Sequence, residues 1–146
     1  KRKKFGKNYN IIVRANADCP IFMPTILDRD IKRFVKNKFD VYSPFHKNIM
    51  PFGFSFVIFE KNTVFKIFKK AKLLKHKEHI ENYCFDNDNK FKILLSPMNE
   101  LYNAPKIKIT LDTKNDFLKI KKIFNMIKNV KISNQPSLLI NLFKKN

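Results

Sequence analysis

Cysteine is scarce in this chain, and its scarcity excludes two kinds of stabilised fold. The sequence contains only Cys19 and Cys84, which lie far apart and form no pairing motif. Disulfide scaffolds and zinc sites need several cysteines, or cysteines with histidines, at short regular spacings. The sequence therefore predicts neither, and the reducing cytoplasm is the simplest location that agrees with it.

Long apolar runs are also missing. No stretch approaches the roughly 20 apolar residues that a membrane-spanning helix requires. The basic residues 1–4 are not followed by the apolar core of a signal peptide. We therefore expect neither a membrane span nor a secretory leader.

Acidic residues are few, and the balance of charge is strongly basic. There are 12 Asp and Glu residues against 31 Lys and Arg residues, which gives a formal net charge of +19. Such a charge favours nucleic acid or an anionic surface as a partner. The lysines are nevertheless spread along the whole chain beside abundant Asn, Ile and Phe, as a coding bias would produce on solvated faces. This distribution favours lysines on solvated faces, and a nucleic-acid footprint is the alternative interpretation.

The apolar content is sufficient for one domain with a core. The chain has 146 residues, of which 44% are hydrophobic. A chain near this length buries roughly 68–70% of the surface that its unfolded form exposes. We therefore treat residues 1–146 as a single domain.

Strand-like and helix-like segments alternate along the chain. The apolar patterns predict strands and helices with the turn residues between them. The expected strands are residues 9–14, 39–42, 54–59, 91–95 and 106–111, and the expected helices are residues 24–37, 62–71, 76–85, 113–127 and 137–143. This alternation predicts an α/β fold with a mostly parallel sheet flanked by helices, in which ligands bind at the carboxyl ends of the strands.

Two of the expected strands are followed by a carboxylate. The continuous apolar run of residues 11–13 is typical of a strand covered on both faces; Asp18 follows it, and Pro20 then stops the segment. Residues 106–111 alternate Lys and Ile and end at Asp112. If the two strands are neighbours, both carboxylates reach one point above the sheet.

Paired carboxylates at such a point suit Mg²⁺. This ion is usually held by one or two carboxylates together with substrate phosphates and water. The chemistry that fits is phosphoryl or nucleotidyl transfer, in which the metal neutralises charge on phosphate oxygens. The alternative is that Asp18 and Asp112 are ordinary loop residues or helix caps, which is the commoner role of an acid after a strand.

Two helix starts carry capping signals. Asn62 can cap the helix that follows residue 59. Thr113 and Asp116 have the spacing of a capping box, with Asp in place of the usual Glu or Gln. The helix after Thr113 places Phe117, Ile120, Phe124 and Ile127 on one side, which we expect to lie against the sheet.

Four segments, taken together, resemble a known family. Residues 13–20, Val-Arg-Ala-Asn-Ala-Asp-Cys-Pro, resemble the Val-Arg-x-Thr-Gly-Asp-Cys-Pro segment of the sugar-activating cytidylyltransferases. These form the spore-coat-polysaccharide and acylneuraminate group, which is related to the Kdo cytidylyltransferases. Residues 51–59, 77–80 and 109–117 are similar to three further segments of that family, in the same order.

The resemblance implies a fold, an activity and a set of site residues. The fold would be that of the Rossmann-like nucleotide-diphosphosugar transferases, and a sugar hydroxyl would attack the α-phosphate of CTP to give a CMP-sugar for surface glycans. Asp18 and Asp112 would hold Mg²⁺, Arg14 would shape the nucleotide or phosphate side, and Glu78 and His79 would lie on the sugar side. The alternatives are a solvated arginine, a helix histidine without substrate contact, and a Glu78 that pairs with a lysine of its own helix.

The chain departs from the family in two ways. The family's nucleotide-gripping loop, rich in Gly with an Arg and a Lys, lies upstream of the segment matched by residues 13–20, and this chain has only two glycines. Ala17 stands where the family has Gly, and Phe52, Ser55 and Val57 stand where it has acids. We therefore expect a partial domain that corresponds to the C-terminal portion of the family.

Three functions from different classes follow. The first is an incomplete cytidylyltransferase that takes CTP and a sugar or sugar acid, with a separate N-terminal half as a partner. The second is an inactive relative that keeps the fold for interaction or homodimerisation, which in the family involves the region matching residues 53–85. The third, supported only by charge, is a basic nucleic-acid-binding domain, whose affinity would fall steeply with salt.

Overall fold

The structure, a computed structural model, describes residues 9–21, 24–44, 53, 56–95, 106–127 and 136–145. The basic start at residues 1–8 and most of the connecting segments expected at 43–53 and 96–105 lie outside these ranges. Phe52 and Ser55, two of the departures from the family pattern, also lie outside them.

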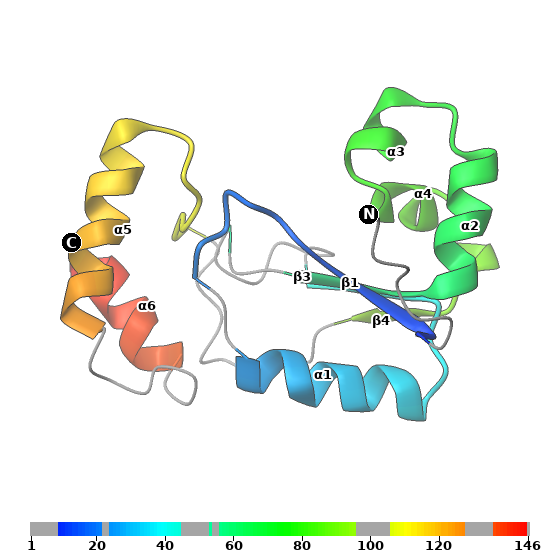
Figure 1. Cartoon of the computed structure of the whole chain (residues 1–146), viewed down its shortest axis with the longest axis horizontal. Helices are drawn as coiled ribbons and strands as arrows, with labels where there is room; N and C mark the ends of the chain where they lie inside the picture. The colour runs from blue at the N-terminus through cyan, green and yellow to red at the C-terminus, as the bar shows by residue number, and fades with distance from the viewer. Residues whose placement is uncertain are drawn as a thin grey trace, which may run out of the picture.

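A sheet of four described strands forms the centre of the molecule (Figure 1). The strands stand in the order β1, β3, β2, β4. Their bounds are Ile11–Ala15 for β1, Val41–Ser43 for β2, Phe56–Glu60 for β3 and Ile93–Leu95 for β4.

The sheet is mixed, so the expectation of a mostly parallel sheet needs correction for the described strands. β3 runs antiparallel to both β1 and β2, whereas β2 and β4 are parallel. The expectation rested on the continuous apolar run of residues 11–13, which is typical of a strand covered on both faces. In the structure it is β3 that is covered on both faces by helices, and it runs antiparallel to its neighbours. A continuous apolar pattern indicates that both faces of a strand are covered, but it does not indicate the direction of the strand.

Alternate side chains of β3 supply the two cores of the molecule. Phe56 and Ile58 pack into one apolar cluster, and Val57 and Phe59 pack into another. Successive side chains of a strand point to opposite faces, so one short strand contributes to both clusters. All four side chains are buried.

Helices cover both faces of the sheet (Figure 1). The first cluster joins the sheet to α1 (Pro24–Lys36), α5 (Lys114–Ile127) and α6 (Pro136–Lys145). The second joins it to α2 (Lys61–Lys70) and α4 (Glu81–Phe85), with α3 (Leu74–Glu78) and the 3-10 turn η1 (Asp88–Lys90) nearby in sequence. The α/β class expected from the sequence is confirmed.

Strand β1 was predicted to be a core strand, and that prediction is wrong for the described sheet. β1 stands at one edge and pairs only with β3 among the described strands. Ile12 and Val13 are 40% and 38% exposed. Burial among the described residues therefore does not explain why these two side chains are apolar.

The start of α2 differs from the prediction by two residues. Glu60, and not Asn62, is the N-cap, and its carboxylate accepts a hydrogen bond of 2.9 Å from the backbone N–H of Thr63. Because β3 passes directly into α2 at Glu60, the chain has already turned into the helix before Asn62. A carboxylate in this position also interacts favourably with the positive end of the helix dipole.

Residues 106–111 were predicted to be a strand, and only an isolated bridge at Lys108 forms. Ile109 is fully buried and Lys108 is exposed, so the inward and outward alternation is present without a ladder. The backbone N–H of Leu111 instead donates a 2.8 Å hydrogen bond to the carbonyl of Asp18. This bond ties the segment to the turn that follows β1.

The capping box at the start of α5 is confirmed. The Asp116 carboxylate accepts a 2.9 Å hydrogen bond from the Thr113 backbone N–H, and the Thr113 hydroxyl accepts one of 3.2 Å from the Asp116 backbone N–H. The predicted inner face is confirmed at Ile120 and Ile127, which are buried. Phe117 and Phe124 are 51% and 57% exposed, because the buried stripe runs through Ile123 instead.

This cap should weaken in acid. Hydrogen bonds from Lys108 and Thr113 lower the pKa of Asp116 to about 2. A carboxylate whose pKa is depressed on folding contributes stability above its unfolded pKa of about 4, and that contribution is lost as pH falls through the folded value. We expect unfolding by urea to become easier between about pH 4 and pH 2.

The matched measurement compares the parent chain with Asp116→Asn over the same pH series. The variant lacks the titrating carboxylate, so its stability should fall less steeply in acid. Equal acid sensitivity in the two proteins would contradict the assignment of this pH dependence to the cap.

Candidate functional site

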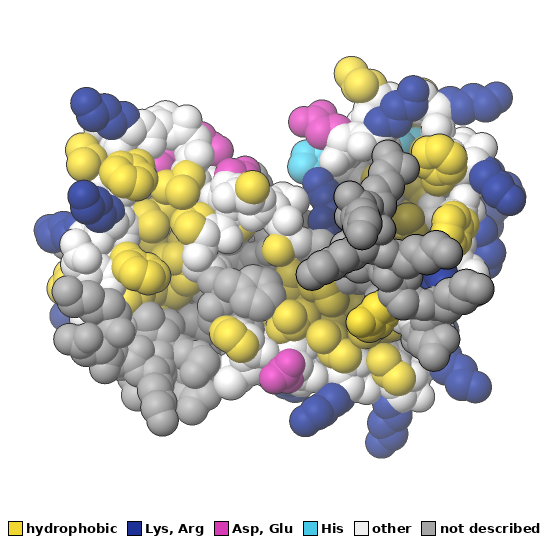
Figure 2. All heavy atoms as spheres, viewed as in Figure 1, with side chains coloured by type: hydrophobic (Ala, Val, Ile, Leu, Met, Phe, Trp, Pro, Cys, Tyr) yellow, Lys and Arg dark blue, Asp and Glu magenta, His cyan; other side chains and the backbone are white. Residues whose placement is uncertain are grey.

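A cavity of about 380 Å³ opens between the α5 and α6 side of the molecule and the α2 to α4 side. Figure 2 shows a hollow there, with acidic side chains on both walls and a histidine on the α2 to α4 wall. The described lining consists of polar side chains, one glycine and one aromatic ring. These residues are Asn16, Asp18, Cys19, Gly53, His79, Glu81, Asn82, Phe85, Thr110 and Asp112.

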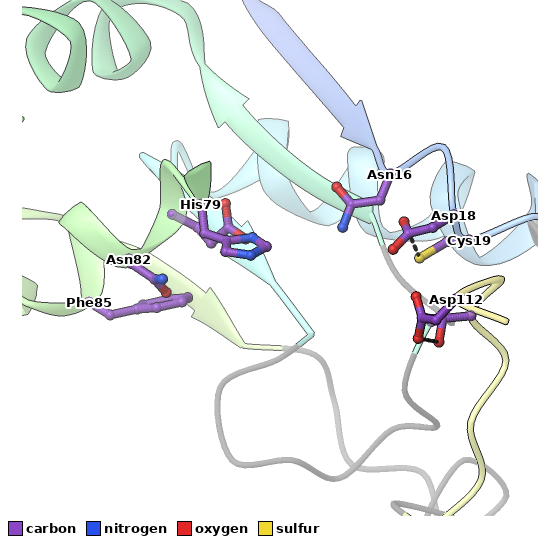
Figure 3. Close-up of a pocket in the computed structure, with 10 residues that line it drawn as sticks. Asn16, Asp18, Cys19, His79, Asn82, Phe85 and Asp112 are labelled. Atoms are coloured by element: carbon purple, nitrogen blue, oxygen red, sulfur yellow. Dashed lines mark hydrogen bonds and ion pairs between the residues drawn. The ribbon is translucent and has the colours of Figure 1, made fainter. Parts of the chain in front are cut away.

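One wall is built where the turn after β1 meets the segment before α5. The backbone N–H of Cys19 bonds to the Asn16 carbonyl at 3.1 Å, which closes the turn and presents Asp18. The Leu111 to Asp18 backbone bond then brings Asp112 alongside. Figure 3 shows Asn16, Asp18 and Asp112 together on this wall. The convergence of the two predicted acids is therefore present, through a backbone bond instead of two neighbouring strands.

Asp112 lies beside a lysine and a threonine hydroxyl. Its Oδ2 accepts hydrogen bonds of 2.8 Å from Lys108 Nζ and from the Thr110 hydroxyl. The Lys108 ammonium, and then the Thr110 hydroxyl, lower the pKa of this carboxyl. In return the two neighbouring carboxylates, Asp112 and Asp116, raise the pKa of Lys108. The wall thus holds a fixed negative charge with one lysine beside it.

The backbone of Gly53 lies very close to the segment that leads to Asp112 on this wall. Its φ of +95° lies in the region that side chains disfavour, and it is buried. A Cβ at this position would stand 2.8 Å from the Ile109 carbonyl carbon and 2.8 Å from Thr110 Cγ2. Glycine is therefore required for the segment leading to Asp112 to lie where it does.

Replacement of Gly53 by alanine should displace that segment. The strained backbone alone should cost about 1–3 kcal/mol of the free energy of unfolding, and the contact with Ile109 and Thr110 adds to it. We expect a lower midpoint of urea unfolding together with altered ligand affinity at the cavity. An alanine variant as stable as the parent would show that the approach is not needed.

The opposite wall comes from α4 and the residues between α3 and α4. Figure 3 shows His79, Asn82 and Phe85 there, facing the two aspartates across the cavity. Glu81 is buried, and its Oε2 forms an ion pair of 2.9 Å with Arg14 Nη1. Its Oε1 lies 3.7 Å from His79 Nδ1. Arg14 thus connects β1 to this wall.

The predicted site residues are only partly brought together. Asp18, Asp112 and His79 line the cavity, whereas Arg14 and Glu78 are not among its described lining. Arg14 Nη2 instead donates a 3.1 Å hydrogen bond to the backbone carbonyl of Glu78. Arg14 therefore contacts this wall through Glu81 and the backbone of Glu78. The roles implied for Arg14 and Glu78 at a substrate stay predictions.

Sequence reasoning missed several lining residues. Asn16, Glu81 and Asn82 were not singled out, although each stands within a few residues of a predicted site residue. Asn16 lies in the Asp18 turn, and Glu81 and Asn82 follow His79 directly. Their closeness in sequence to Asp18 and His79 could have identified them, because residues of one turn or one helix start face the same space.

The two aspartates are the candidate ligands for Mg²⁺. Both offer hard carboxylate oxygens on one exposed wall, and this donor set fits an ion that binds few protein ligands. Within the described ranges, no group of three or more His, Cys, Asp and Glu side chains is arranged to hold a metal. The site therefore suits a metal that also takes ligands from a substrate phosphate.

The two cysteines have contrasting surroundings. Cys84 is fully buried, and its burial, followed by the charges of Asp40 and Glu81, raises the pKa of its thiol to about 12. Cys19 is half-buried in the cavity wall, with its Sγ 3.5 Å from Asp18 Oδ1. Neither forms a disulfide.

A second cavity, of about 330 Å³, lies beside α2 and α3. Its lining is mainly apolar and includes Val64, Ile67 and Ile80. The polar residues of its described lining are His76 and Lys77. The first cavity is therefore the candidate site for polar substrates. In the part of the chain that the structure describes, no helix is both long and apolar enough to cross a membrane.

Comparison with known proteins finds a relative of similar sequence. No family model matches the chain. An uncharacterized protein of Methanocaldococcus jannaschii is 32% identical over 121 residues, a match that covers 81% of this chain and 49% of that protein. The chain spans about half the length of this relative.

A solved structure is also similar. A cytidylyltransferase from Leptospira borgpetersenii serovar Hardjo-bovis superposes with a TM-score of 0.82 at 27% sequence identity. The match covers 94% of this chain and 57% of that one. The described chain therefore has a cytidylyltransferase fold, as the resemblance of its sequence segments implied.

Proposed function

We propose that the chain is the C-terminal portion of a nucleotidyltransferase that transfers CMP from CTP to a sugar or sugar acid. The observation that carries the proposal is the pairing of Asp18 and Asp112 on one cavity wall, in a chain similar to a solved cytidylyltransferase. Products of this kind would serve surface glycan synthesis.

The proposed reaction is a single displacement at phosphorus. An oxygen of the sugar hydroxyl forms a bond to the α-phosphorus of CTP, the bond from that phosphorus to pyrophosphate breaks, and the hydroxyl proton passes to solvent. Mg²⁺, when bound, would supply positive charge that neutralises the phosphate oxygens. Asp18 and Asp112 would hold the ion.

The remaining residues would position the reactants. Lys108 holds Asp112 in place through its 2.8 Å ion pair. His79 and Asn82 on the opposite wall would contact the sugar, since they face the two aspartates across the cavity (Figure 3). Such positioning accounts for a large part of catalysis when two reactants must meet.

Partial coverage of both relatives supports a contribution from further polypeptide. This chain covers 57% of the solved cytidylyltransferase and 49% of the archaeal protein. The exposed apolar residues Ile12 and Val13 of β1 offer a surface for such a contribution. An upstream Gly-rich loop with Arg and Lys is the part that we propose to complete the nucleotide site.

Binding of CTP tests this proposal. In the presence of Mg²⁺, CTP should bind weakly to this chain alone and at least about 10-fold more tightly, or 1.4 kcal/mol, once an upstream half is supplied. Calorimetric titration measures both affinities, with ATP and with EDTA as controls. Equal affinities of the completed protein for CTP and ATP, or an affinity for CTP that EDTA does not change, would contradict the proposal.

An inactive relative is the second candidate. Val57, at a position where the family has an acid, is buried with Phe59 and Ile67 and presents no carboxylate to the cavity. This arrangement favours a role in interaction instead of turnover. Its distinguishing result would be that the completed protein binds CTP but releases no pyrophosphate from it, whichever sugar is offered.

A further inference from the structure

We infer that the surface formed by α2, α3 and the turn between them binds to an anionic lipid bilayer. We call it the α2–α3 surface and define it by the exposed residues from Phe65 to Lys77. The inference does not depend on the function proposed for the first cavity. It follows from the types of residue that are exposed, from their charges and from their place in the fold.

Large apolar side chains are exposed on the α2–α3 surface. Phe65 and Phe68 stand three residues apart and so share one face of α2, where they are 56% and 84% exposed. Leu73, the N-cap of α3, and Leu74, its first residue, are 54% and 79% exposed. Single exposed apolar side chains are common, whereas a group of them indicates contact with another apolar surface.

The remaining exposed residues of the α2–α3 surface are lysines. They are Lys66, Lys69, Lys70, Lys72, Lys75 and Lys77. Residues 61–77 contain no acid. Lys75 pairs with Asp86, and the other five lysines form no ion pair with another described residue. The apolar group is therefore surrounded by positive charge that calls for an anionic partner.

The place of this surface in the fold suits a bilayer. The turn that joins α2 to α3 lies at an end of the molecule, away from the sheet (Figure 1). Figure 2 shows hydrophobic side chains over this part of the molecule, with Lys and Arg side chains around them. In such an arrangement the apolar side chains can enter the boundary between headgroups and acyl chains while the lysine ammonium groups stay at the anionic headgroups.

Two other partners fit the α2–α3 surface less well. Single-stranded nucleic acid would stack its bases on Phe65 and Phe68, but Leu73 and Leu74 offer no ring for stacking. A second copy of the chain would bring two lysine-rich surfaces together, and like charges oppose that contact. Anionic lipids satisfy the apolar and the cationic side chains at once.

Vesicle flotation tests the inference with the parent chain. Vesicles of equal parts phosphatidylglycerol and phosphatidylcholine supply anionic headgroups, whereas vesicles of phosphatidylcholine alone carry no net charge. We expect the chain to bind the mixed vesicles at least about 10-fold more tightly, and added salt to weaken that binding. Equal binding to the two kinds of vesicle, or no binding to either, would overturn the inference.

A single tryptophan reports which part of the molecule enters the bilayer. The sequence contains no tryptophan, so Leu74→Trp and Phe124→Trp each yield a protein with one indole. Both positions are exposed, and Phe124 lies on α5. With mixed vesicles the emission of Leu74→Trp should shift to shorter wavelength, because its indole leaves water. An equal or larger shift in Phe124→Trp, or no shift in Leu74→Trp, would overturn the inference.

Serine variants test the apolar contribution. Phe68→Ser with Leu74→Ser removes the two most exposed apolar side chains and should weaken binding to mixed vesicles at least about 10-fold. Phe117→Ser with Phe124→Ser, the same kind of change at exposed positions of α5, should leave that binding unchanged. Circular dichroism establishes that each variant is folded. Equal losses in the two double variants would overturn the place given to the contact.

Glutamine variants test the ionic contribution in the same way. Lys69→Gln with Lys72→Gln removes two charges from the α2–α3 surface, and Lys114→Gln with Lys122→Gln removes two from exposed positions of α5. The first pair should weaken binding to mixed vesicles more than the second, because charges at the bilayer surface contribute most. Equal losses would show that only the net charge of the chain matters and would overturn the inference.

The two other partners are tested with the same variant. Fluorescence anisotropy with an oligouridine measures binding to RNA, and analytical ultracentrifugation measures self-association. We expect neither to change in Phe68→Ser with Leu74→Ser. Loss of RNA binding, or dissociation of a dimer, in a variant whose vesicle binding equals that of the parent would assign the α2–α3 surface to that partner and overturn the inference.

Discussion

Asp18→Asn and Asp112→Asn should each lower turnover by the completed enzyme about 100-fold or more, which corresponds to roughly 2.7 kcal/mol of transition-state stabilisation. Each change removes one negative charge from the wall where the two side chains meet. The amide keeps the shape of the carboxylate but binds Mg²⁺ weakly. Pyrophosphate release at saturating CTP and sugar measures the effect.

The fold should be unaffected by these two changes. Asp18 and Asp112 are exposed, and the bond that joins their segments uses the backbone of Leu111 and Asp18. Asp28→Asn on α1, which is also exposed and is not among the residues that line the cavity, serves as the matched control and should keep full activity. Full activity in either site variant would refute the metal assignment.

Asp30→Ala should cost about 1–3 kcal/mol of the free energy of unfolding. The Asp30 side chain is completely buried in α1. Its Oδ2 accepts a 2.7 Å hydrogen bond from the Tyr42 hydroxyl, and its Oδ1 accepts a 2.8 Å bond from Arg29 Nε. Removal of the carboxylate takes away the acceptor shared by a buried hydroxyl and a cation.

Urea unfolding of Asp30→Ala, compared with Tyr42→Phe, measures this contribution. Tyr42→Phe removes one hydrogen bond to a charged group and should cost about 1.5–3 kcal/mol. The exposed change Asp28→Ala should stay within about 0.5 kcal/mol of the parent. If Asp30→Ala were no worse than Asp28→Ala, the Asp30 contacts would contribute nothing to stability.

Asp30 also shows where sequence reasoning about the fold stopped. Ile26, Asp30 and Phe34 follow one another at intervals of four and share the buried face of α1. The apolar pattern of residues 24–37 predicts one face formed by Ile26, Leu27, Ile31, Phe34 and Val35. Ile26 and Phe34 are indeed buried, but Val35 is 55% exposed. A polar residue in an apolar stripe is identified as buried only when its partner, here Tyr42, is known.

The pairing of the strands required information that the local pattern does not carry. Residues 54–59 were recognised as strand-forming, and β3 indeed begins at Phe56. Its antiparallel pairing with both β1 and β2 depends on the connections between them. Strand propensity reports a fit to a pleated surface and leaves the direction of the neighbour open.

The meeting of Asp18 and Asp112 was easier to predict than the sheet. Asp18 and Asp112 were paired by their positions after apolar segments, and the structure places both on one cavity wall. The backbone hydrogen bond from Leu111 to Asp18 joins their segments, and no pattern of side chains in the sequence predicts such a bond. For the same reason the contacts of Arg14 with Glu81 and Glu78, across 67 and 64 residues of sequence, were beyond local reasoning.

The contrast between the two cysteines makes the chain suitable for selective labelling. At neutral pH the buried Cys84 thiol, with its pKa of about 12, stays protonated and should resist alkylation. Cys19 lies at the cavity wall beside Asp18, within reach of a small reagent such as iodoacetamide. A spectroscopic tag could thus be attached next to the two aspartates without any mutation, and its signal would report when that space is filled.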